Sequence, residues 1–289
     1  MKHKKTERIV DILNTIEDQL KKCHISTPRL DAEVLVGHYV NRDRSALYRN
    51  GDYRPTDEEL QGLQTGVARR IKGEPIAYIT GIKEFFSLEF EVNHHVLIPR
   101  PETEILVEEI LRLIGNKTLQ RGKILEIGTG CGAISIALAT ELTQFYFFAA
   151  DISQKALTVA KRNARRNGVA ERIFFLCGNL LESLSEQFDI IVSNPPYISD
   201  EEFKHISFEI RNHEPRTALI AGPDGTEFHQ ALIRNGGPHL RKGGWLIMEM
   251  GYGQWETIER LLRESQKYDY IRCQYDYAGI ERVATARRR

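Results

Sequence analysis

The second half of this chain alternates between short apolar runs and helical patterns. Apolar runs that predict strands lie at 124–127, 146–150, 173–177, 189–193 and 245–250, with a last pair at 271–275 and 282–286. Helical patterns at 133–142 and 153–167 separate the first three of these strands. Such alternation is typical of a parallel sheet with helices on both faces, so we predict a doubly wound α/β domain over residues 96–289.

Three helical patterns precede this domain. The first covers 9–20, and the second begins at Thr27, a capping residue directly before a proline. The third begins with a capping box at 56–59 and stops near Gly73. We expect these helices to pack as a small bundle over residues 1–75.

The pattern changes between the two regions. From Ile79 to Val92 the chain shows short β-like runs, and from Phe86 onward apolar side chains alternate with polar ones, which is the period of a strand. We therefore predict a β-hairpin linker, residues 76–95, that joins the helical bundle to the α/β domain.

The composition excludes several classes of protein. Forty basic residues balance forty acidic ones in the 289 residues, which disfavours bulk binding to nucleic acid or to a membrane surface. The four cysteines are scattered without a CxxC pair or zinc-like histidine spacing, so we expect no metal site and a reducing compartment. No signal-peptide core or membrane-length apolar run is found, which predicts a cytoplasmic protein.

A glycine-rich loop, Gly128-Thr129-Gly130-Cys131-Gly132, follows the first strand of the α/β domain and leads into a helix. Glycines at this place let the backbone approach a ligand closely. With the alanine that follows, the loop also satisfies the looser pattern of a dinucleotide-binding motif, so two kinds of cofactor compete.

Two acidic residues bear on that choice. Glu126, directly before the loop, would repel a pyrophosphate and suits S-adenosylmethionine, whose amino-acid end has a positive ammonium. Asp151 follows the loop by about twenty residues, where a carboxylate that accepts hydrogen bonds from ribose hydroxyls is expected. A helix-capping role for Asp151 remains the alternative.

A second candidate site, Asn194-Pro195-Pro196-Tyr197, directly follows the apolar run at 188–193. Ligands of open α/β sheets lie at the carboxyl ends of the strands, and two consecutive prolines there provide carbonyl acceptors but no N–H donors. The Asn194 side-chain oxygen and a backbone carbonyl together accept both hydrogens of a planar –NH2 group, with Tyr197 as a flat wall. The motif therefore predicts a pocket for an amide or an aromatic amine.

Taken together, these segments resemble a known family, the peptide-release-factor glutamine methyltransferases (PrmC/HemK) among the class I S-adenosylmethionine-dependent methyltransferases. The resemblance extends over nearly the whole chain. The matching segments are 28–33, 73–81, 85–88, 97–104, 126–132, 192–198, 214–219 and 281–283.

The resemblance implies a Rossmann-like methyltransferase sheet and an enzyme that methylates the glutamine of the Gly-Gly-Gln loop in class-1 release factors, with S-adenosylhomocysteine as the second product. It implies an N-terminal bundle that holds the rest of the partner. The residues expected at the cofactor are Glu126, Gly128, Thr129, Gly130, Cys131, Gly132, Asp151, Asn179 and Asn194. Those expected at the substrate amide are Asn194, Pro195, Pro196 and Tyr197.

One departure from the family pattern concerns the adenine. Such enzymes usually have an acidic residue near the adenine amino group, and this chain has Gly178-Asn179 there. The contact is expected to be weaker or to be made by the Asn179 oxygen.

Other residues and functions remain open at this stage. His94-His95 are expected to be a surface pair, Arg100 either pairs with a carboxylate or faces the partner, and Glu214 either lines the pocket or anchors a turn. An adenine amino-group methyltransferase acting on DNA or RNA would share the motif at Asn194, because a flipped adenine also presents a planar –NH2. A nicotinamide oxidoreductase and a non-catalytic module that binds cofactor only to fold are further alternatives.

Overall fold

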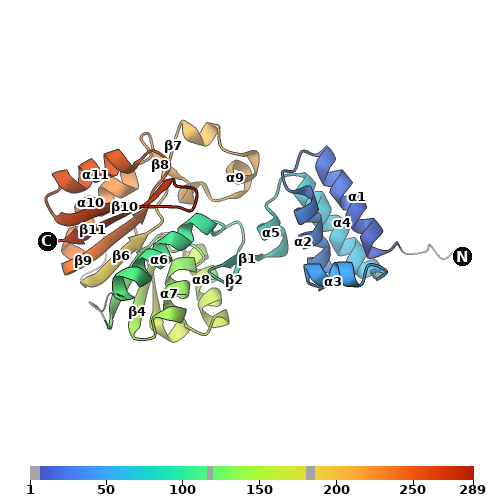
Figure 1. Ribbon diagram of the computed structural model, residues 1–289, viewed down its shortest axis with the longest axis horizontal. Helices are drawn as coiled ribbons and strands as arrows, with labels where there is room; N and C mark the ends of the chain where they lie inside the picture. The colour runs from blue at the N-terminus through green and yellow to red at the C-terminus, as the bar shows by residue number, and fades with distance from the viewer. Residues whose placement is uncertain (1–6, 116–119, 180–185) are drawn as a thin grey trace, which may run out of the picture. The chain divides into compact units, whose positions relative to one another are not determined.

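The computed structural model of the protein describes residues 7–115, 120–179 and 186–289. Its contacts divide the chain into two compact units (Figure 1). The helical unit consists of the chain up to Gly81 together with Phe208–His213, and the α/β unit consists of Ile82–Ser207 and Glu214–Arg289.

The expected helices of the bundle are confirmed, including the capping box at 56–59. These helices bury apolar side chains such as Leu13, Leu35 and Leu47 in a core of their own. The helices are α1 (Ile9–Lys22), α2 (Pro28–Tyr39), α3 (Arg44–Arg49), α4 (Asp57–Ile71) and α5 (Ile76–Thr80).

The last of these helices corrects the expected start of the linker. Ile79 and Thr80 are helical rather than β-like, because the helix begins directly after Pro75, whose carbonyl accepts from the Ile79 N–H at 3.1 Å, and Gly81, at φ 75°, ends it in the left-handed region. The hairpin begins only at Ile82.

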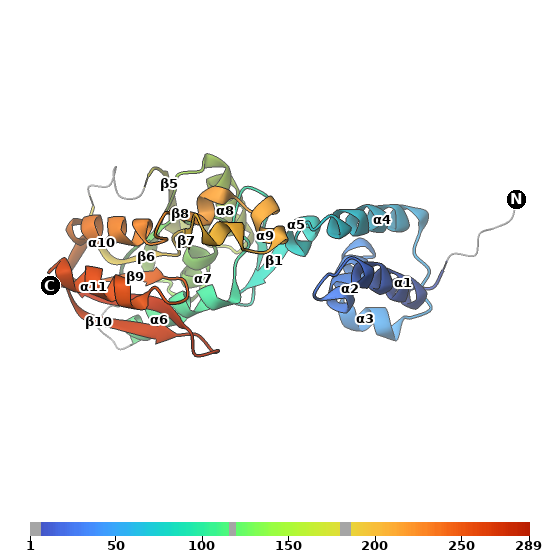
Figure 2. The same cartoon turned by 90° about the horizontal axis from the view of Figure 1, so that it is seen from above.

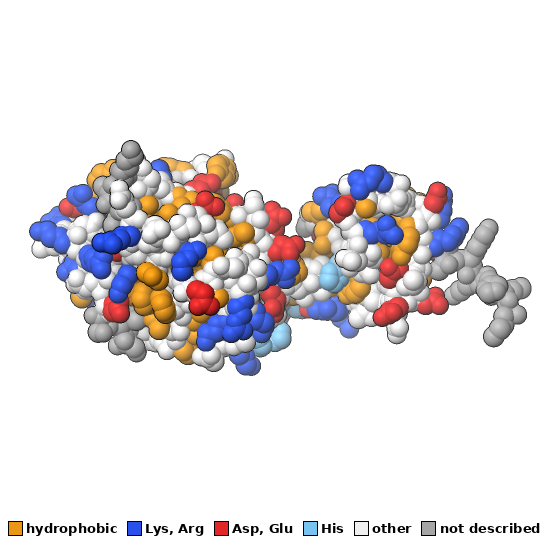
Figure 3. Space-filling view, turned by 90° about the horizontal axis from the view of Figure 1, so that it is seen from below, with side chains coloured by type: hydrophobic (Ala, Val, Ile, Leu, Met, Phe, Trp, Pro, Cys, Tyr) orange, Lys and Arg blue, Asp and Glu red, His pale blue; other side chains and the backbone are white. Residues whose placement is uncertain are grey.

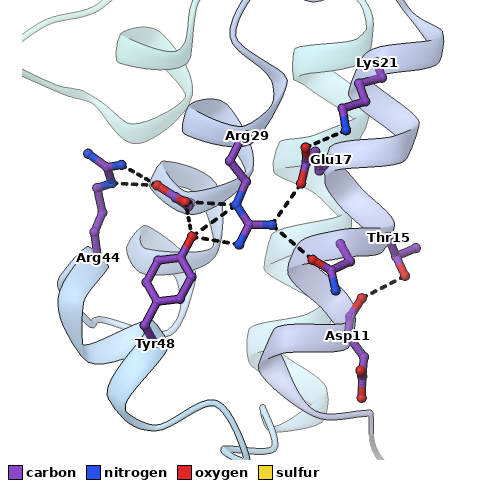
Figure 4. Close-up of polar contacts among 9 residues, drawn as sticks. Asp11, Thr15, Glu17, Lys21, Arg29, Arg44 and Tyr48 are labelled. Atoms are coloured by element: carbon purple, nitrogen blue, oxygen red, sulfur yellow. Dashed lines mark hydrogen bonds and ion pairs between the residues drawn. The ribbon is translucent and has the colours of Figure 1, made fainter.

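A buried carboxylate connects three helices of the bundle (Figure 4). Glu33 on α2 accepts hydrogen bonds from Arg29, at 3.0 Å, from Arg44, at 2.7 Å, and from the Tyr48 hydroxyl. Arg29 also reaches Glu17 on α1, at 2.9 Å. Because a buried charge is costly unless it is paired, this cluster requires α1, α2 and α3 to keep one arrangement.

The helical unit also includes α9 (Phe208–His213), which comes from far along the chain. Arg70 on α4 is buried and donates to Asp31, at 2.6 Å, and to Glu209 on α9, at 2.8 Å. A Cβ atom at Gly73 would lie 2.9 Å from the Phe208 ring, so only glycine permits this contact. No pattern in the sequence predicts that α9 packs with the bundle.

The α/β unit contains the predicted doubly wound sheet (Figure 2). Its strand order is β10-β11-β9-β6-β3-β4-β5, parallel except for β11, which is antiparallel to both neighbours. The strands are β3 (Gly122–Ile127), β4 (Phe145–Asp151), β5 (Ile173–Cys177), β6 (Phe188–Ser193), β9 (Leu240–Glu249), β10 (Tyr268–Tyr275) and β11 (Glu281–Arg288).

Helices cover both faces of this sheet. In Figure 1, α6 (Glu104–Leu113), α7 (Ala133–Glu141) and α8 (Gln154–Arg166) lie on one face, and α10 (Glu227–His239) and α11 (Trp255–Glu264) lie on the other. Leu232, Ile258 and Leu262 of α10 and α11 pack in one core cluster with Ile191 and Leu246 of the strands. Neither α10 nor α11 was predicted from the sequence.

Two small sheets flank the central one. The hairpin of β1 (Ile82–Phe85) and β2 (Leu88–Glu91) confirms the predicted strand pattern. A parallel pair, β7 (Ile198–Ser199) and β8 (Ile220–Gly222), begins directly after the Asn-Pro-Pro-Tyr motif.

Asn163 on α8 connects the hairpin to the glycine-rich loop. Its side chain accepts from the Glu91 N–H, at 2.7 Å, and donates to the Glu91 carbonyl, at 3.0 Å, and to the Cys131 carbonyl, at 2.9 Å. Asn163 is fully buried, so all three bonds are shielded from water. The hairpin is therefore connected to the glycine-rich loop through Asn163.

Candidate functional site

A cavity of about 330 Å³ lies in the α/β unit at the carboxyl ends of the parallel strands. The loops after β3, β4, β5 and β6 all contribute to its wall, which is where ligands of such sheets bind. The wall residues from these loops and from the strand ends before them are Ile127, Gly128, Gly130, Ala150, Asp151, Ile152, Ser153, Gly178, Asn179, Ser193, Asn194, Pro195 and Pro196. Other parts of the wall come from His95, Val96, Leu97, Ala156, Pro215, Thr217, Ala218, Ile220 and Phe228.

The three glycines of the loop have different roles, although all have positive φ. Gly128 and Gly130 line the cavity, and a Cβ atom at either would meet no side chain. Gly132 does not line it. A Cβ atom there would lie 2.8 Å from Ile136 and 3.3 Å from Ala160, so this glycine permits α7 to pack closely against α8.

Most backbone donors of the loop are already in use. The Gly128 and Thr129 N–H groups both donate to the Ala150 carbonyl, at 2.9 and 3.0 Å, and the Gly130 N–H donates to the Asp151 carboxylate, at 2.8 Å. A pyrophosphate site needs free N–H groups at a loop and helix N-terminus. These three donors cannot serve it.

The Glu126 side chain points into the protein and hydrogen-bonds to the start of α7. Its Oε2 accepts from the Thr129 hydroxyl, at 2.7 Å, and from the Ser135 N–H in the first turn of α7, at 3.0 Å. The side chain is buried and is not part of the cavity wall. Glu126 therefore opposes a pyrophosphate by filling the anion position itself, and the structure does not bring it to the ligand side of the loop.

Burial also changes the acidity of this group. Removal from water raises the pKa of Glu126 to about 7, against the lowering effect of hydrogen bonds from Ser135 and Thr129. Thr129 and Cys131 are buried as well, outside the cavity wall. Of the predicted cofactor residues in this segment, the structure brings only Gly128 and Gly130 into the wall.

Asp151 lines the cavity and shapes the loop at the same time. One carboxylate oxygen accepts from Gly130 and the other from the Ser153 N–H, at 2.8 Å each. Ser153, not Asp151, caps α8, since its hydroxyl accepts from the Ala156 N–H. The helix-capping alternative for Asp151 is therefore wrong. Burial raises the pKa of Asp151, although these two backbone hydrogen bonds favour its ionised form.

Asn194 lies in the cavity wall with a defined amide orientation. Its Nδ2 donates to the Thr103 hydroxyl oxygen, at 3.0 Å, which leaves Oδ1 as the free end of the amide. The preceding Ser193 hydroxyl donates to the Ile127 carbonyl, at 2.8 Å, and is not available to a ligand. With Pro195 and Pro196 in the wall and without N–H groups, this edge of the cavity offers acceptors.

Tyr197 is placed differently from the flat wall that was expected. It is not among the residues that line the cavity; its hydroxyl donates to the buried Glu249 at the end of β9, at 3.3 Å. Burial raises the pKa of Tyr197, so its hydroxyl stays protonated. Gln254 holds the backbone of the motif by donating to the Tyr197 carbonyl, at 2.9 Å.

Several residues around the cavity were open questions or were missed. Arg100 pairs with the buried Glu214, which also accepts from the Ile98 N–H at 3.2 Å, so both anchor the segments that lead into the wall. His95 lines the cavity with its ring 3.9 Å from that of His94. Thr103 was missed as a partner of Asn194, although it lies in a segment that was singled out.

No group of three or more His, Cys, Asp or Glu side chains in the described ranges is arranged to hold a metal ion. Among the same residues, no helix has both the length and the apolar character needed to cross a membrane.

Comparison with known proteins places this geometry in a family. The model of the PrmC N-terminal domain matches residues 11–81, and the model of the methyltransferase small domain matches residues 101–213. The release factor glutamine methyltransferase of Geobacter sulfurreducens is 38% identical over 277 residues, which cover 96% of this chain and 95% of that protein. The chain belongs to the family of release factor glutamine methyltransferases.

Two further similarities define the extent of the match. The bifunctional methyltransferase of Rickettsia typhi is 40% identical over 267 residues, which cover 86% of this chain and 52% of that protein, so this family member spans about half the length of that relative. The solved catalytic domain of hMettl16, in complex with MAT2A 3′UTR hairpin 6, has a TM-score of 0.55 at 21% identity and covers 80% of this chain and 82% of that one. This likeness confirms the methyltransferase fold of the α/β unit.

Replacing Glu126 with glutamine tests the internal carboxyl at α7. The folded-state pKa of Glu126, about 7, lies above the unfolded value of 4.5, so the stability of the wild type falls as pH rises from about 4.5 to 7. Above pH 7 the contribution of Glu126 to stability no longer changes. Glu126→Gln removes this loss and keeps an oxygen acceptor. At pH 8 the variant is expected to be more stable by up to about 3 kcal/mol, and at pH 4 the difference disappears.

Denaturant unfolding followed by tryptophan fluorescence is the measurement, because Trp245 and Trp255 both lie in the α/β unit. The exposed Glu141→Gln at the end of α7 is the control and leaves the pH dependence unchanged. A Glu126→Gln variant less stable than wild type at pH 8 would show that the ionised carboxylate stabilises the loop.

Proposed function

We propose that this chain transfers a methyl group from S-adenosylmethionine to the side-chain amide nitrogen of the glutamine in the Gly-Gly-Gln loop of class-1 release factors. The observation that supports this most directly is the amide orientation of Asn194. With Nδ2 bonded to Thr103, Oδ1 is left to accept a hydrogen from a substrate –NH2 group.

The wall of the cavity fits S-adenosylmethionine better than a dinucleotide. The loop has open space over Gly128 and Gly130 but no free N–H at positions 128 to 130 for phosphate. Asp151 would hold the ribose and Asn179 would lie toward the adenine, since both are part of the wall. When bound, the cofactor supplies an electrophilic methyl group on a sulfonium.

The residues of the motif orient the nucleophile. A carboxamide nitrogen is a poor nucleophile because its lone pair is delocalised into the carbonyl. If Asn194 Oδ1 and the Pro195 carbonyl each accept one N–H, they hold the nitrogen in a single orientation, and both bonds strengthen as positive charge develops there. The nitrogen would form the new N–C bond as the bond between the sulfonium sulfur and the methyl carbon breaks, which leaves S-adenosylhomocysteine, and it would release its proton to solvent afterwards, so no base is needed before transfer.

The helical unit is proposed to hold the rest of the release factor. The proposal keeps the domains predicted from the sequence, which are the helical bundle at 1–75, the linker at 76–95 and the catalytic domain at 96–289. The support is the separate core of the bundle, which leaves its surface available for a partner. The glycines of the substrate loop would let it enter the cavity without side-chain clash.

All four cysteines are free thiols, in keeping with a cytoplasmic setting.

An adenine methyltransferase would use the same acceptors, so charge is the discriminating feature. Figure 3 shows a group of Lys and Arg side chains on one face of the α/β unit, with acidic side chains beside them. On α8, Arg162 pairs with Glu91 and Arg166 pairs with Glu89, which reduces the positive charge open to a nucleic-acid backbone. This pairing favours a protein substrate.

The cofactor proposal is tested at Asp151. Asp151→Ala removes a charge-assisted acceptor and is expected to weaken S-adenosylmethionine binding by roughly 1.5–3 kcal/mol, while Asp151→Asn, which keeps one oxygen, loses less. Isothermal calorimetry measures both, and thermal unfolding of the two variants controls for loosening of the loop. An unchanged dissociation constant, or tighter binding of a nicotinamide dinucleotide by the wild type, would contradict the proposal.

The substrate proposal is tested at Asn194. Asn194→Ala is expected to lower the methylation rate of a release factor by about 10²–10³, because one preorganised acceptor is lost, with little change in cofactor affinity. Asn194→Asp keeps an oxygen but loses the donor to Thr103 and adds charge near the sulfonium, so it retains measurable activity and binds cofactor differently. Asn167→Ala, at the end of α8, is the control. Wild-type turnover by Asn194→Ala, or faster methylation of nucleic acid than of release factor, would refute the assignment.

The role of the bundle is tested by removing residues 1–75. The remaining chain is expected to bind S-adenosylmethionine with unchanged affinity, because the sheet and its helices form their own core. Its kcat/KM is expected to fall much more on whole release factor than on a short Gly-Gly-Gln peptide, since the bundle would supply only remote binding energy. Equal losses on both substrates would mean that the bundle acts through the fold of the catalytic unit.

A further inference from the structure

Glu249 is a buried carboxyl that the proposed mechanism does not use. It lies at the end of β9 with 1% of its surface exposed. Its Oε1 accepts from the Tyr197 hydroxyl, and its Oε2 makes no hydrogen bond of ordinary geometry. A carboxyl buried with one oxygen unpartnered costs stability, so its presence beside the site needs an explanation.

Thr103 connects this carboxyl to Asn194. The Thr103 oxygen accepts from Asn194 Nδ2 at 3.0 Å, so the single proton of the hydroxyl is free to point to another acceptor. Glu249 is next to it, and the interaction with Thr103 favours the ionised carboxylate. No hydrogen bond joins Thr103 to Glu249 Oε2 in the structure, so a chain in which each donor points from Asn194 toward Glu249 is complete only when the Thr103 proton turns to that unpartnered oxygen.

We propose that Glu249 is a positioning residue that, through Thr103, keeps the Asn194 amide turned with Oδ1 toward the substrate. The inference rests on the proposed function, because it concerns the acceptor that function assigns to Asn194. An ionised Glu249 accepts hydrogens and donates none, so the chain has only one possible direction.

A protonated Glu249 would permit the opposite direction. Its O–H could donate to Thr103, and the Thr103 proton would then turn toward Asn194, where only Oδ1 accepts a hydrogen. The amide would rotate and present its –NH2 group to the cavity. A substrate –NH2 would then face a donor in place of an acceptor, and methyl transfer would be lost.

The surroundings of Glu249 determine the pH at which this change occurs. Burial raises the pKa of Glu249 to about 7, and Glu102 adds to this, while Thr103, Arg282 and Tyr197 favour the ionised form. Arg282 on β11 is itself paired with Asp276, at 3.1 Å. From α10, His229 hydrogen-bonds to the Glu249 carbonyl, at 2.7 Å, and burial lowers the pKa of His229 to about 4, so it adds no charge near neutral pH.

The test compares Glu249→Gln with wild type in release-factor methylation as a function of pH. In wild type, kcat is expected to rise as pH increases through about 7, as Glu249 ionises. Glu249→Gln has an –NH2 that donates to Thr103 at every pH, so its kcat is expected to be about 10- to 100-fold lower at pH 8 and to lack this rise. The dissociation constant for S-adenosylhomocysteine is expected to stay at the wild-type value.

Two substitutions at Thr103 keep the inference testable if Glu249→Gln does not fold. Thr103→Val removes the link and is expected to lower kcat as Glu249→Gln does, with no further loss when both are combined, whereas Thr103→Ser restores activity and the pH profile. Glu109→Gln is the matched control, because Glu109 is another buried carboxyl of the same unit, bonded to Arg112 and Arg272 and absent from the cavity wall. It leaves the kcat–pH profile unchanged.

A readout without turnover separates this inference from the proposed function. The side-chain amide NMR signals of Asn194 in the ligand-free protein are expected to shift near pH 7 in wild type and not in Glu249→Gln. If wild type methylates no release factor but the signals shift, the proposed function fails and the positioning role stands. Wild-type kcat and pH profile in Glu249→Gln, or Asn194 signals insensitive to Glu249, would overturn the inference.

Discussion

Two carboxylates determine the shape of the glycine-rich loop, and the cavity depends on that shape. Glu126 accepts from the Ser135 N–H in the first turn of α7, and Asp151 accepts from the Gly130 N–H. Because the Ala150 carbonyl and the Asp151 carboxylate accept from the N–H groups of residues 128 to 130, this part of the loop presents an open backbone face instead of a set of free N–H groups. A loop with the spacing of a dinucleotide motif thereby becomes unsuitable for a pyrophosphate.

In the proposed function, the direction of the hydrogen bonds around Asn194 selects the substrate class. Asn194 donates to the Thr103 hydroxyl, the Ser193 hydroxyl donates to the Ile127 carbonyl, and Pro195 has no N–H. This edge therefore presents acceptors to the cavity. A substrate group that brings two hydrogens in one plane satisfies such an edge, and a group that brings none leaves it unpaired. Under the proposed function, the site would therefore select an –NH2 group by the two hydrogens that its acceptors bind, and contacts outside the cavity would distinguish an amide from an aromatic amine.

Local patterns in the sequence predicted the elements, and long-range contacts decided the details. The strands around the cavity, the capping box and the place of Asn194 in the cavity wall follow from patterns within about ten residues of each position. The contacts of Thr103 with Asn194, of Tyr197 with Glu249 and of Glu209 with Arg70 join residues 91, 52 and 139 positions apart. No single-sequence pattern encodes such pairs. For the same reason Glu126 was placed at the ligand, since its neighbours in the sequence do not reveal which way a strand-end side chain points.

Two buried carboxyls, at the ends of β3 and β9, have pKa values raised to about 7, but their protonation has different consequences. Glu126 accepts from the backbone N–H of Ser135, and an amide N–H can only donate, so this bond keeps its direction whatever the proton does. Glu249 is bonded to the Tyr197 hydroxyl and lies beside the Thr103 hydroxyl, and a hydroxyl can either donate or accept. Although the desolvation cost is similar, the hydrogen bond at Glu126 keeps one direction, whereas the proposed chain of hydrogen bonds at Glu249 can reverse its direction. The partner of a buried carboxyl, more than its pKa, decides whether its titration reaches the substrate.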